Sequence, residues 1–206
     1  MNFSKKNIFL CLMALGLSFK LYAADSSPLP MIEAINKNVI TNLKSHQSEL
    51  KHKPSIVQNT IRQYFIPYVD TQGMSRSVLG RNAWRQASNQ EKQAFTQEFT
   101  RLVLRTYAQP LANYNGETVE FLPLKPSSTQ RFSQVQSVIV RPNGQRIAMT
   151  YHLVLDPSGT WKIYDLSVEG VSLLNSFRNQ FGEALKQDNL KSVIQALHQK
   201  NENLAS

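Results

Sequence analysis

Cysteine is nearly absent from the sequence. The chain has one, Cys11, and it lies within a segment that we expect to be removed. Without it, the mature chain can form no disulfide and offers no thiol for catalysis or metal binding. Its fold must therefore rest on a hydrophobic core alone, which a chain of roughly 180 residues can build as one domain.

Long apolar runs are also scarce, and the most marked one covers residues 8–19. Two lysines precede it and two alanines follow it, which is the order found in a secretory signal peptide. The run is shorter than the ~20 apolar residues that a bilayer-spanning helix needs. We therefore expect residues 1–23 to be a cleaved signal peptide and residues 24–206 to form one domain in the periplasm.

Acidic residues are few, with 14 Asp and Glu against 23 Lys and Arg and a formal net charge of +9. Such a surplus can attract nucleic acid, anionic lipid head groups or an acidic protein. An exported protein does not meet nucleic acid, so we expect no nucleic-acid partner. The sequence also lacks any long block of like charges, so the surplus is equally consistent with scattered charge that keeps the protein in solution.

Motifs of covalent and nucleotide chemistry are missing as well. The eight glycines are well separated, and none belongs to a Gly-x-Ser-x-Gly elbow, a phosphate-binding loop or a dinucleotide fingerprint. Four histidines, His46, His52, His152 and His198, are not spaced as the ligands of a zinc site. We therefore expect neither a metal nor a cofactor.

His152 and Asp165 are the best candidates for catalytic residues. They lie on two successive predicted strands and could form an acid–base pair of a small hydrolase or isomerase. Alternatively, Asp165 is structural, because a carboxylate inside an apolar strand needs a partner such as Arg81 or Arg101. His152 is likewise consistent with a hydrogen-bonded core histidine.

The chain after the leader begins with helical periodicity. Residues 30–50 place apolar side chains on one face, and a second short helix is predicted from Ser55 to Pro67. Asp70 can cap a third helix, which is predicted to end at Gly80.

A capping box formed by Ser88 and Glu91 is the strongest local signal. In this motif each side chain accepts a hydrogen bond from the backbone amide of the other residue. It predicts the start of a long helix that Pro110 limits. Trp84 is predicted to lie in the short connector before it.

The middle of the chain switches to the period of two that is typical of strands. The predicted strands are residues 119–122, 132–140, 146–155 and 161–168, with turn sequences between the last three. Two helices follow, one over residues 171–185 and one capped by Asp188. The chain is therefore predicted to be α+β: a twisted antiparallel sheet of about four strands, packed with helices from both ends of the chain and enclosing an apolar cavity.

Two separated blocks of sequence carry a family resemblance. The first contains Val78-Leu79-Gly80-Arg81, Trp84-Arg85, Glu98-Phe99 and Arg105-Thr106-Tyr107-Ala108. The second contains Trp161-Lys162-Ile163-Tyr164-Asp165, Val168-Glu169-Gly170-Val171-Ser172-Leu173 and Arg178-Asn179-Gln180-Phe181. In order and spacing, nearly the whole mature chain resembles the MlaC family, also called toluene-tolerance auxiliary proteins.

The resemblance implies a periplasmic carrier and no enzyme. Proteins of this family shuttle phospholipid between an outer-membrane lipoprotein–porin complex and an inner-membrane ABC transporter whose periplasmic ring contains MCE domains. The implied fold holds the acyl tails between the sheet and the helices. Phospholipid would be the cargo, and no cofactor is implied. The enzyme that uses His152 and Asp165 and a lipid-free adaptor stay as alternatives.

A lipid-binding surface can be selected from the apolar pattern, although a packed core uses the same kinds of residue. One wall is predicted on the long helix, one on the sheet and one on the segment after it. The predicted lining residues are Phe95, Phe99, Leu102, Val103, Tyr107, Met149, Tyr151, Leu153, Ile163, Val171, Leu174 and Phe177.

Overall fold

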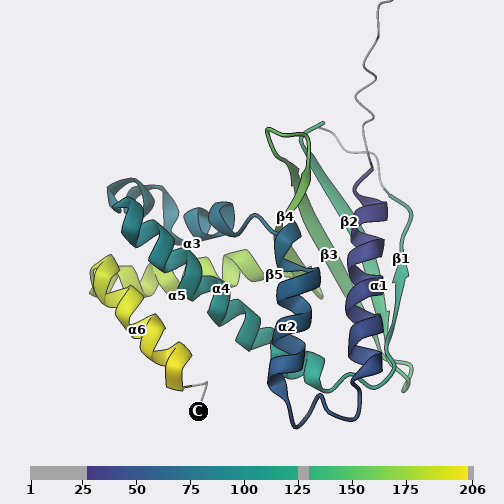
Figure 1. Cartoon of the computed structure of the whole chain (residues 1–206). Coiled ribbons are helices and arrows are strands. Elements are labelled where there is room, and N and C mark those ends of the chain that lie inside the picture. Colours follow the sequence, from purple (N-terminus) through teal and green to yellow (C-terminus); the bar gives the residue numbers. More distant parts are fainter. Residues whose placement is uncertain (1–26, 125–129, 204–206) are drawn as a thin grey trace, which may run out of the picture.

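The segments of period two form one antiparallel sheet in the computed structural model, which describes residues 27–124 and 130–203 (Figure 1). The predicted signal peptide, residues 1–23, lies outside the described residues. Five strands pair in sequence order: β1 (Thr118–Phe121), β2 (Phe132–Val140), β3 (Arg146–Leu155), β4 (Trp161–Val168) and β5 (Val171–Ser172). The predicted α+β class and the antiparallel meander of the three long strands are confirmed.

The prediction of about four strands omitted β5, because two residues carry no detectable periodicity. A second feature that the pattern did not predict is a shift of register between β3 and β4 at His152 and Leu153. Such an irregularity leaves one strand with an extra residue and changes which side chains share a face.

Helices come from both ends of the chain, as predicted. They are α1 (Leu29–Ser45), α2 (Pro54–Tyr64), a short 3-10 helix η1 (Ile66–Tyr68), α3 (Thr71–Gln86), α4 (Asn89–Ala112), α5 (Leu173–Gln187) and α6 (Leu190–Asn203). In Figure 1, α1 lies along the sheet, whereas α3, α4, α5 and α6 gather beside it. Among the described residues, no helix is long and apolar enough to cross a bilayer.

Two main buried clusters follow from this arrangement. The helical core joins α3, α4, α5 and α6, and its buried members are Met74, Val78, Leu79, Phe95, Phe99, Leu102, Leu174, Phe177, Phe181, Val193 and Leu197. The sheet core joins α1 to the sheet, and its buried members are Ile32, Ile35, Val135, Tyr151, Leu153, Trp161 and Ile163. A smaller cluster around Leu43, Leu50, Val57 and Ala108 joins α1, α2 and the end of α4.

Both predicted caps of the central helices are confirmed. The Asp70 side chain accepts a hydrogen bond from the Gly73 amide at 2.8 Å. Ser88 and Glu91 form the reciprocal capping box at the start of α4. These motifs are local in sequence, which is why the sequence alone could predict them.

Gly80 ends one helical stretch, as predicted, because its backbone is not helical (φ 78°, ψ 165°). A further stretch follows directly, so that Trp84 lies in α3 and not in a connector. Other predicted boundaries were wrong. The helix predicted over residues 30–50 ends at Ser45. Pro110 lies inside α4, where a proline so near the end of the helix removes only one backbone hydrogen bond. Asn189, not Asp188, provides the cap of α6, because its Oδ1 accepts from the Ser192 amide at 3.0 Å.

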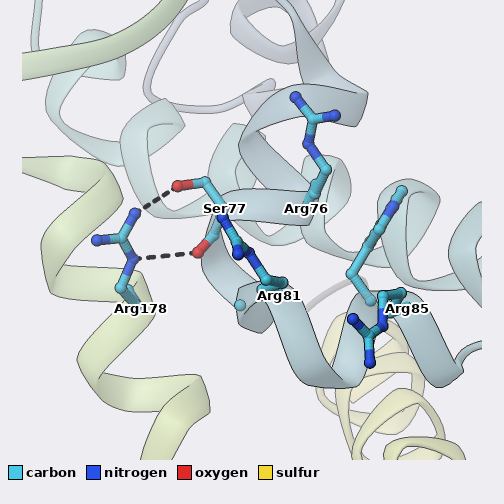
Figure 2. Close-up of a pocket in the computed structure, with 7 residues that line it drawn as sticks. Arg76, Ser77, Arg81, Arg85 and Arg178 are labelled. Atoms are coloured by element: carbon cyan, nitrogen blue, oxygen red, sulfur yellow. Dashed lines mark hydrogen bonds between the residues drawn. The ribbon is translucent and has the colours of Figure 1, made fainter.

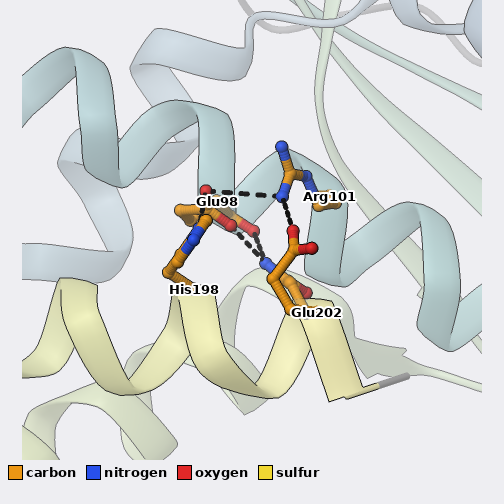
Figure 3. A network of polar contacts seen from close by, with 5 residues as sticks. Glu98, Arg101, His198 and Glu202 are labelled. Atoms are coloured by element: carbon orange, nitrogen blue, oxygen red, sulfur yellow. Dashed lines mark hydrogen bonds and ion pairs between the residues drawn. The ribbon is translucent and has the colours of Figure 1, made fainter. Parts of the chain in front are cut away.

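A polar cluster attaches α6 to α4 (Figure 3). Asn201 donates from Nδ2 to Oε2 of the buried Glu98 at 2.7 Å and to the Glu98 backbone carbonyl at 2.9 Å. His198 Nδ1 lies 2.9 Å from Glu98 Oε1. Arg101 lies between the two carboxylates, 3.6 Å from Glu98 and 2.8 Å from Glu202. The cluster therefore gives a buried carboxylate the partners that it needs.

These contacts set the direction of the pKa shift of Glu98. Burial raises the pKa, but the hydrogen bonds from Asn201 and His198 and the charge of Arg101 outweigh it, so the pKa of Glu98 lies below its ordinary value of 4.5. A carboxylate with a lowered pKa stabilises the fold above its unfolded pKa. That contribution is lost as the pH falls through the folded value.

We predict that Glu98→Gln lowers the free energy of unfolding by about 1–2 kcal/mol at neutral pH, because the hydrogen bonds lose their charged acceptor. Urea unfolding should show this difference shrinking as the pH falls below about 4. Glu183→Gln, which removes the exposed ion pair with Lys186, serves as the control and should change little. A difference that stays constant with pH would contradict the assignment.

Candidate functional site

The predicted lining residues divide among two packed cores and a half-buried border. Five of them belong to the helical core: Phe95, Phe99, Leu102, Leu174 and Phe177. The ring of Phe99 packs edge-on against that of Phe177, with centroids 5.2 Å apart, and is stacked with Phe95 at 5.8 Å. Aromatic rings at these distances are in van der Waals contact and leave no gap between them. This group therefore forms a solid inner wall.

Three sheet residues lie in the sheet core. Tyr151, Leu153 and Ile163 are almost completely buried and pack with α1. The Tyr151 hydroxyl donates to Asn36 Oδ1 at 3.0 Å, which ties the strand to that helix. These side chains thus lie on the α1 side of the sheet, and the structure does not bring them into the helical core.

Val171 was predicted to close the interior, and this is wrong. Its side chain is 61% exposed. The helix starts only at Leu173, with Ser172 accepting from the Asn175 amide as its cap. Val171 therefore belongs to the edge strand β5 and points outward.

Three predicted residues remain half-buried. Val103 and Tyr107 on α4 pack at the border of the helical core, and Met149 on β3 packs at the border of the sheet core. An apolar side chain that is neither exposed nor enclosed is available to a ligand at little cost to the fold. These residues are the part of the predicted site that can still bind something.

We use the word junction for four half-buried residues at the border of the helical core: Val69, Val103, Tyr107 and Tyr164. Val69 packs against the sheet core as well, and Tyr164 extends from β4 to the helical core. Burial, and then the negative charge of Asp165, raises the pKa of both Tyr107 and Tyr164. The junction is therefore apolar, with two neutral phenols close to one fixed carboxylate. Sequence periodicity missed Val69 and Tyr164, because neither belongs to a predicted apolar stripe.

Asp165 fixes the start of α5. Its Oδ1 accepts from the backbone amides of Leu166 at 2.8 Å and Leu174 at 2.9 Å, and its Oδ2 accepts from the Ser172 hydroxyl at 2.6 Å. The predicted partners Arg81 and Arg101 do not take part, because backbone amides at a helix start satisfy the carboxylate instead.

His152 lies opposite Asp165 in the sheet register, but its hydrogen bond runs elsewhere. Its Nε2 lies 2.9 Å from the Ser167 hydroxyl, and its ring is tilted against that of Tyr164. The two candidate catalytic residues therefore have separate partners, each of a structural kind. In the described ranges, no group of His, Cys, Asp and Glu is arranged to hold a metal ion.

We predict that Asp165→Ala lowers the free energy of unfolding by about 3 kcal/mol, because it leaves two backbone amides and a hydroxyl without their charged acceptor. His152→Ala should cost about 1 kcal/mol, since it removes one hydrogen bond. Urea denaturation of the two variants checks both values. Similar losses in the two variants would show that Asp165 is not the main attachment of α5.

Comparison with known proteins places this arrangement in a family. The model of the MlaC protein family matches residues 33–199. The chain is 24% identical over 178 residues to the intermembrane phospholipid transport system binding protein MlaC of Haemophilus influenzae, covering 85% of this chain and 83% of that protein. It is 25% identical over 168 residues to the toluene tolerance protein ttg2D of Pseudomonas putida, covering 82% and 77%.

A solved structure is similar as well. The phospholipid-binding protein from Ralstonia solanacearum, in complex with a phospholipid, is 26% identical and superposes with a TM-score of 0.79. The match covers 88% of this chain and 100% of that one. The resemblance seen in the sequence blocks is therefore confirmed, and the chain belongs to the MlaC family.

Proposed function

We propose that the protein binds a phospholipid and carries it through the periplasm. The observation that carries the proposal is the structure of the Ralstonia relative, which was solved in complex with a phospholipid. The fold match covers the whole of that chain. The Haemophilus relative, a binding protein of an intermembrane phospholipid transport system, supports it. The donor and acceptor that we propose are an outer-membrane lipoprotein–porin complex and an inner-membrane ABC transporter with a ring of MCE domains.

Such a carrier has a clear physical task. Each methylene exposed to water costs about 0.8 kcal/mol, so two acyl tails cross water unaided only against a barrier far above ~10 kcal/mol. An apolar site on a protein removes this barrier, because the tails move from the apolar interior of the membrane to the apolar interior of the site. Its recognition of the tails can therefore be loose, and no catalytic step or cofactor is needed.

The acyl tails are proposed to enter at the junction. Its residues are apolar and half-buried, and a tail inserted there would touch the helical core on one side and the sheet core on the other. Val103 and Tyr107 of the junction, together with Met149 at the border of the sheet core, are the proposed contacts. The fully buried members of the predicted set, such as Phe99 and Leu153, would form the walls behind them.

We assign no reaction to the protein. Asp165 accepts hydrogen bonds from Ser172 and Leu174 at the start of α5, and His152 bonds Ser167. A general base has to reach a substrate proton, and neither residue is arranged to do so. The alternative of a hydrolase or isomerase therefore has no geometric support.

Native mass spectrometry of the protein, purified without detergent, should show one bound phospholipid per chain. The mass difference should disappear after extraction with organic solvent, and the extract should contain the lipid. This measurement separates a carrier from an adaptor that binds membrane complexes without lipid. Protein that is lipid-free in several gentle preparations would contradict the proposal.

Substitutions at two neighbouring residues of α4 can distinguish a residue that contacts lipid from one that belongs to the supporting core. Leu102 is 5% exposed within the helical core, so Leu102→Lys buries a charge and should lower the free energy of unfolding by several kcal/mol. Val103 is half-buried, so Val103→Lys can turn its ammonium toward water and should mainly lower lipid occupancy.

Lipid occupancy by native mass spectrometry and thermal unfolding are measured on both variants, with Val103→Leu as the apolar control. We expect Val103→Leu to keep its lipid. If Val103→Lys keeps full occupancy, or loses stability to the same extent as Leu102→Lys, the junction is ordinary core.

A further inference from the structure

A hollow in the surface lies between α3 and α5, with a volume of about 610 Å³. Figure 2 shows the side chains around it, and most of them are arginines. Its lining residues are Arg76, Ser77, Gly80, Arg81, Trp84, Arg85 and Arg178. The proposed lipid contacts do not include this surface. Five of its residues, Gly80, Arg81, Trp84, Arg85 and Arg178, belong to the sequence blocks that carry the family resemblance.

Two local features give the hollow its form. Gly80 interrupts α3 with a positive φ of 78°, which an L side chain rarely adopts, and a Cβ built there meets nothing within 4 Å. On the opposite wall, Arg178 donates from Nε to the Ser77 carbonyl at 3.1 Å and from Nη2 to the Ser77 hydroxyl. The interruption and the attachment place the four arginines along the lining of one hollow, and their guanidinium groups point in different directions (Figure 2).

The hollow contains positive charge without compensation. None of its lining residues is acidic. Within residues 27–124 and 130–203, no ion pair includes Arg76, Arg81, Arg85 or Arg178. Of the other arginines in these ranges, Arg101, Arg141 and Arg146 form ion pairs, whereas Arg62, Arg105 and Arg131 do not. What sets the hollow apart is that four unpaired arginines line one space.

The spacing of these arginines increases the repulsion. Arg81 and Arg85 are four residues apart, the spacing at which like charges on a helix repel. Such a cluster destabilises the free protein slightly, and an anionic partner would relieve the repulsion.

The spread of the charges indicates what kind of anion fits. Arg76 and Arg85 lie in the two helical stretches on either side of Gly80, and Figure 2 shows their side chains pointing in opposite directions. A single phosphate offers its oxygens at one point and does not suit both. An extended chain presents side chains on one face every ~7 Å, so carboxylates on alternate residues can reach separated arginines.

We propose that this hollow docks an acidic segment of a partner protein. The surface is concave, which suits a projecting segment better than the flat surface of an anionic bilayer, and the ring of Trp84 provides an apolar contact beside the arginines. Exposed guanidinium groups can form bidentate pairs with carboxylates. The proposal does not rest on lipid binding, because it concerns a different surface of the molecule.

The test measures binding of a fluorescent peptide of alternating glutamate and glycine, about eight residues long, which spans the hollow when extended. Fluorescence anisotropy at low salt compares the unchanged protein with a variant that carries Arg76→Gln and Arg85→Gln. The dissociation constant should rise about fivefold, the effect of losing two exposed charge pairs. Added salt should weaken binding to the unchanged protein.

A matched control carries Arg62→Gln and Arg131→Gln, two exposed arginines outside the hollow. It has the same net charge as the test variant and should bind the peptide nearly as well as the unchanged protein. Equal loss in both variants would overturn the proposal, since it would show attraction by net charge alone. Arg178 is left in place because it also holds Ser77.

Two further probes separate the alternatives. Vesicles that contain phosphatidylglycerol should bind the test and control variants alike. The proposal would be overturned in favour of a membrane contact if the test variant alone lost vesicle binding while its peptide binding stayed unchanged. Inorganic phosphate that displaces the peptide at equal ionic strength would overturn it in favour of a small-anion site. Lipid occupancy of the test variant should be unchanged, so failure here leaves the carrier function untouched.

Discussion

Strand β4 holds the starts of helices α3 and α5. The position of the helical core depends on these two attachments. The Asp70 amide donates to the Ile163 carbonyl at 2.9 Å, and the Asp70 side chain then caps α3. Two residues further along β4, Asp165 bonds the start of α5. Both helices of the hollow therefore begin at one strand. The attachment of α3 to β4 is a backbone hydrogen bond, whereas that of α5 is a charged side chain that satisfies a backbone amide. Neither helix can shift without leaving polar groups unpaired.

Much of the fold could be predicted from the sequence because its signals are local. The strands β2, β3 and β4 follow from alternation over eight to ten residues, and the caps at Asp70 and Ser88 follow from motifs within four positions. The shortest strand, the end of α1, the start of α5 and the cap of α6 were missed, and helical structure continues directly after Gly80 and past Pro110. At those places the local signal is weak or is overridden by packing of the helices.

The division of the apolar residues between the helical core and the sheet core could not be predicted from local signals. Leu153 and Phe99 have equally clear apolar patterns, yet one packs with α1 and the other with α5. The register shift at His152 adds a further difficulty, because Ile163 and Leu166, three residues apart, both contact the sheet core. Strict alternation would place them on opposite faces. The face of the sheet to which each residue of β4 points thus depends on the register of its pairing with β3. This register cannot be read from the sequence of β4 alone.

The same reasoning applies to the arginines and shows why carrying and docking can be separate tasks. Along the sequence the charges look scattered, and only the interruption at Gly80 and the bond from Arg178 to Ser77, 101 residues away, bring four of them together. An apolar junction can hold a tail but cannot select a destination, since every membrane offers the same hydrocarbon. Charge can select, because paired carboxylates and guanidinium groups require a matching spacing. Helix α3 begins at β4 beside Val69 of the junction, and the hollow lies around its interruption at Gly80. A partner that docks on Arg76 and Arg85 would therefore contact the helix that starts at the proposed lipid site.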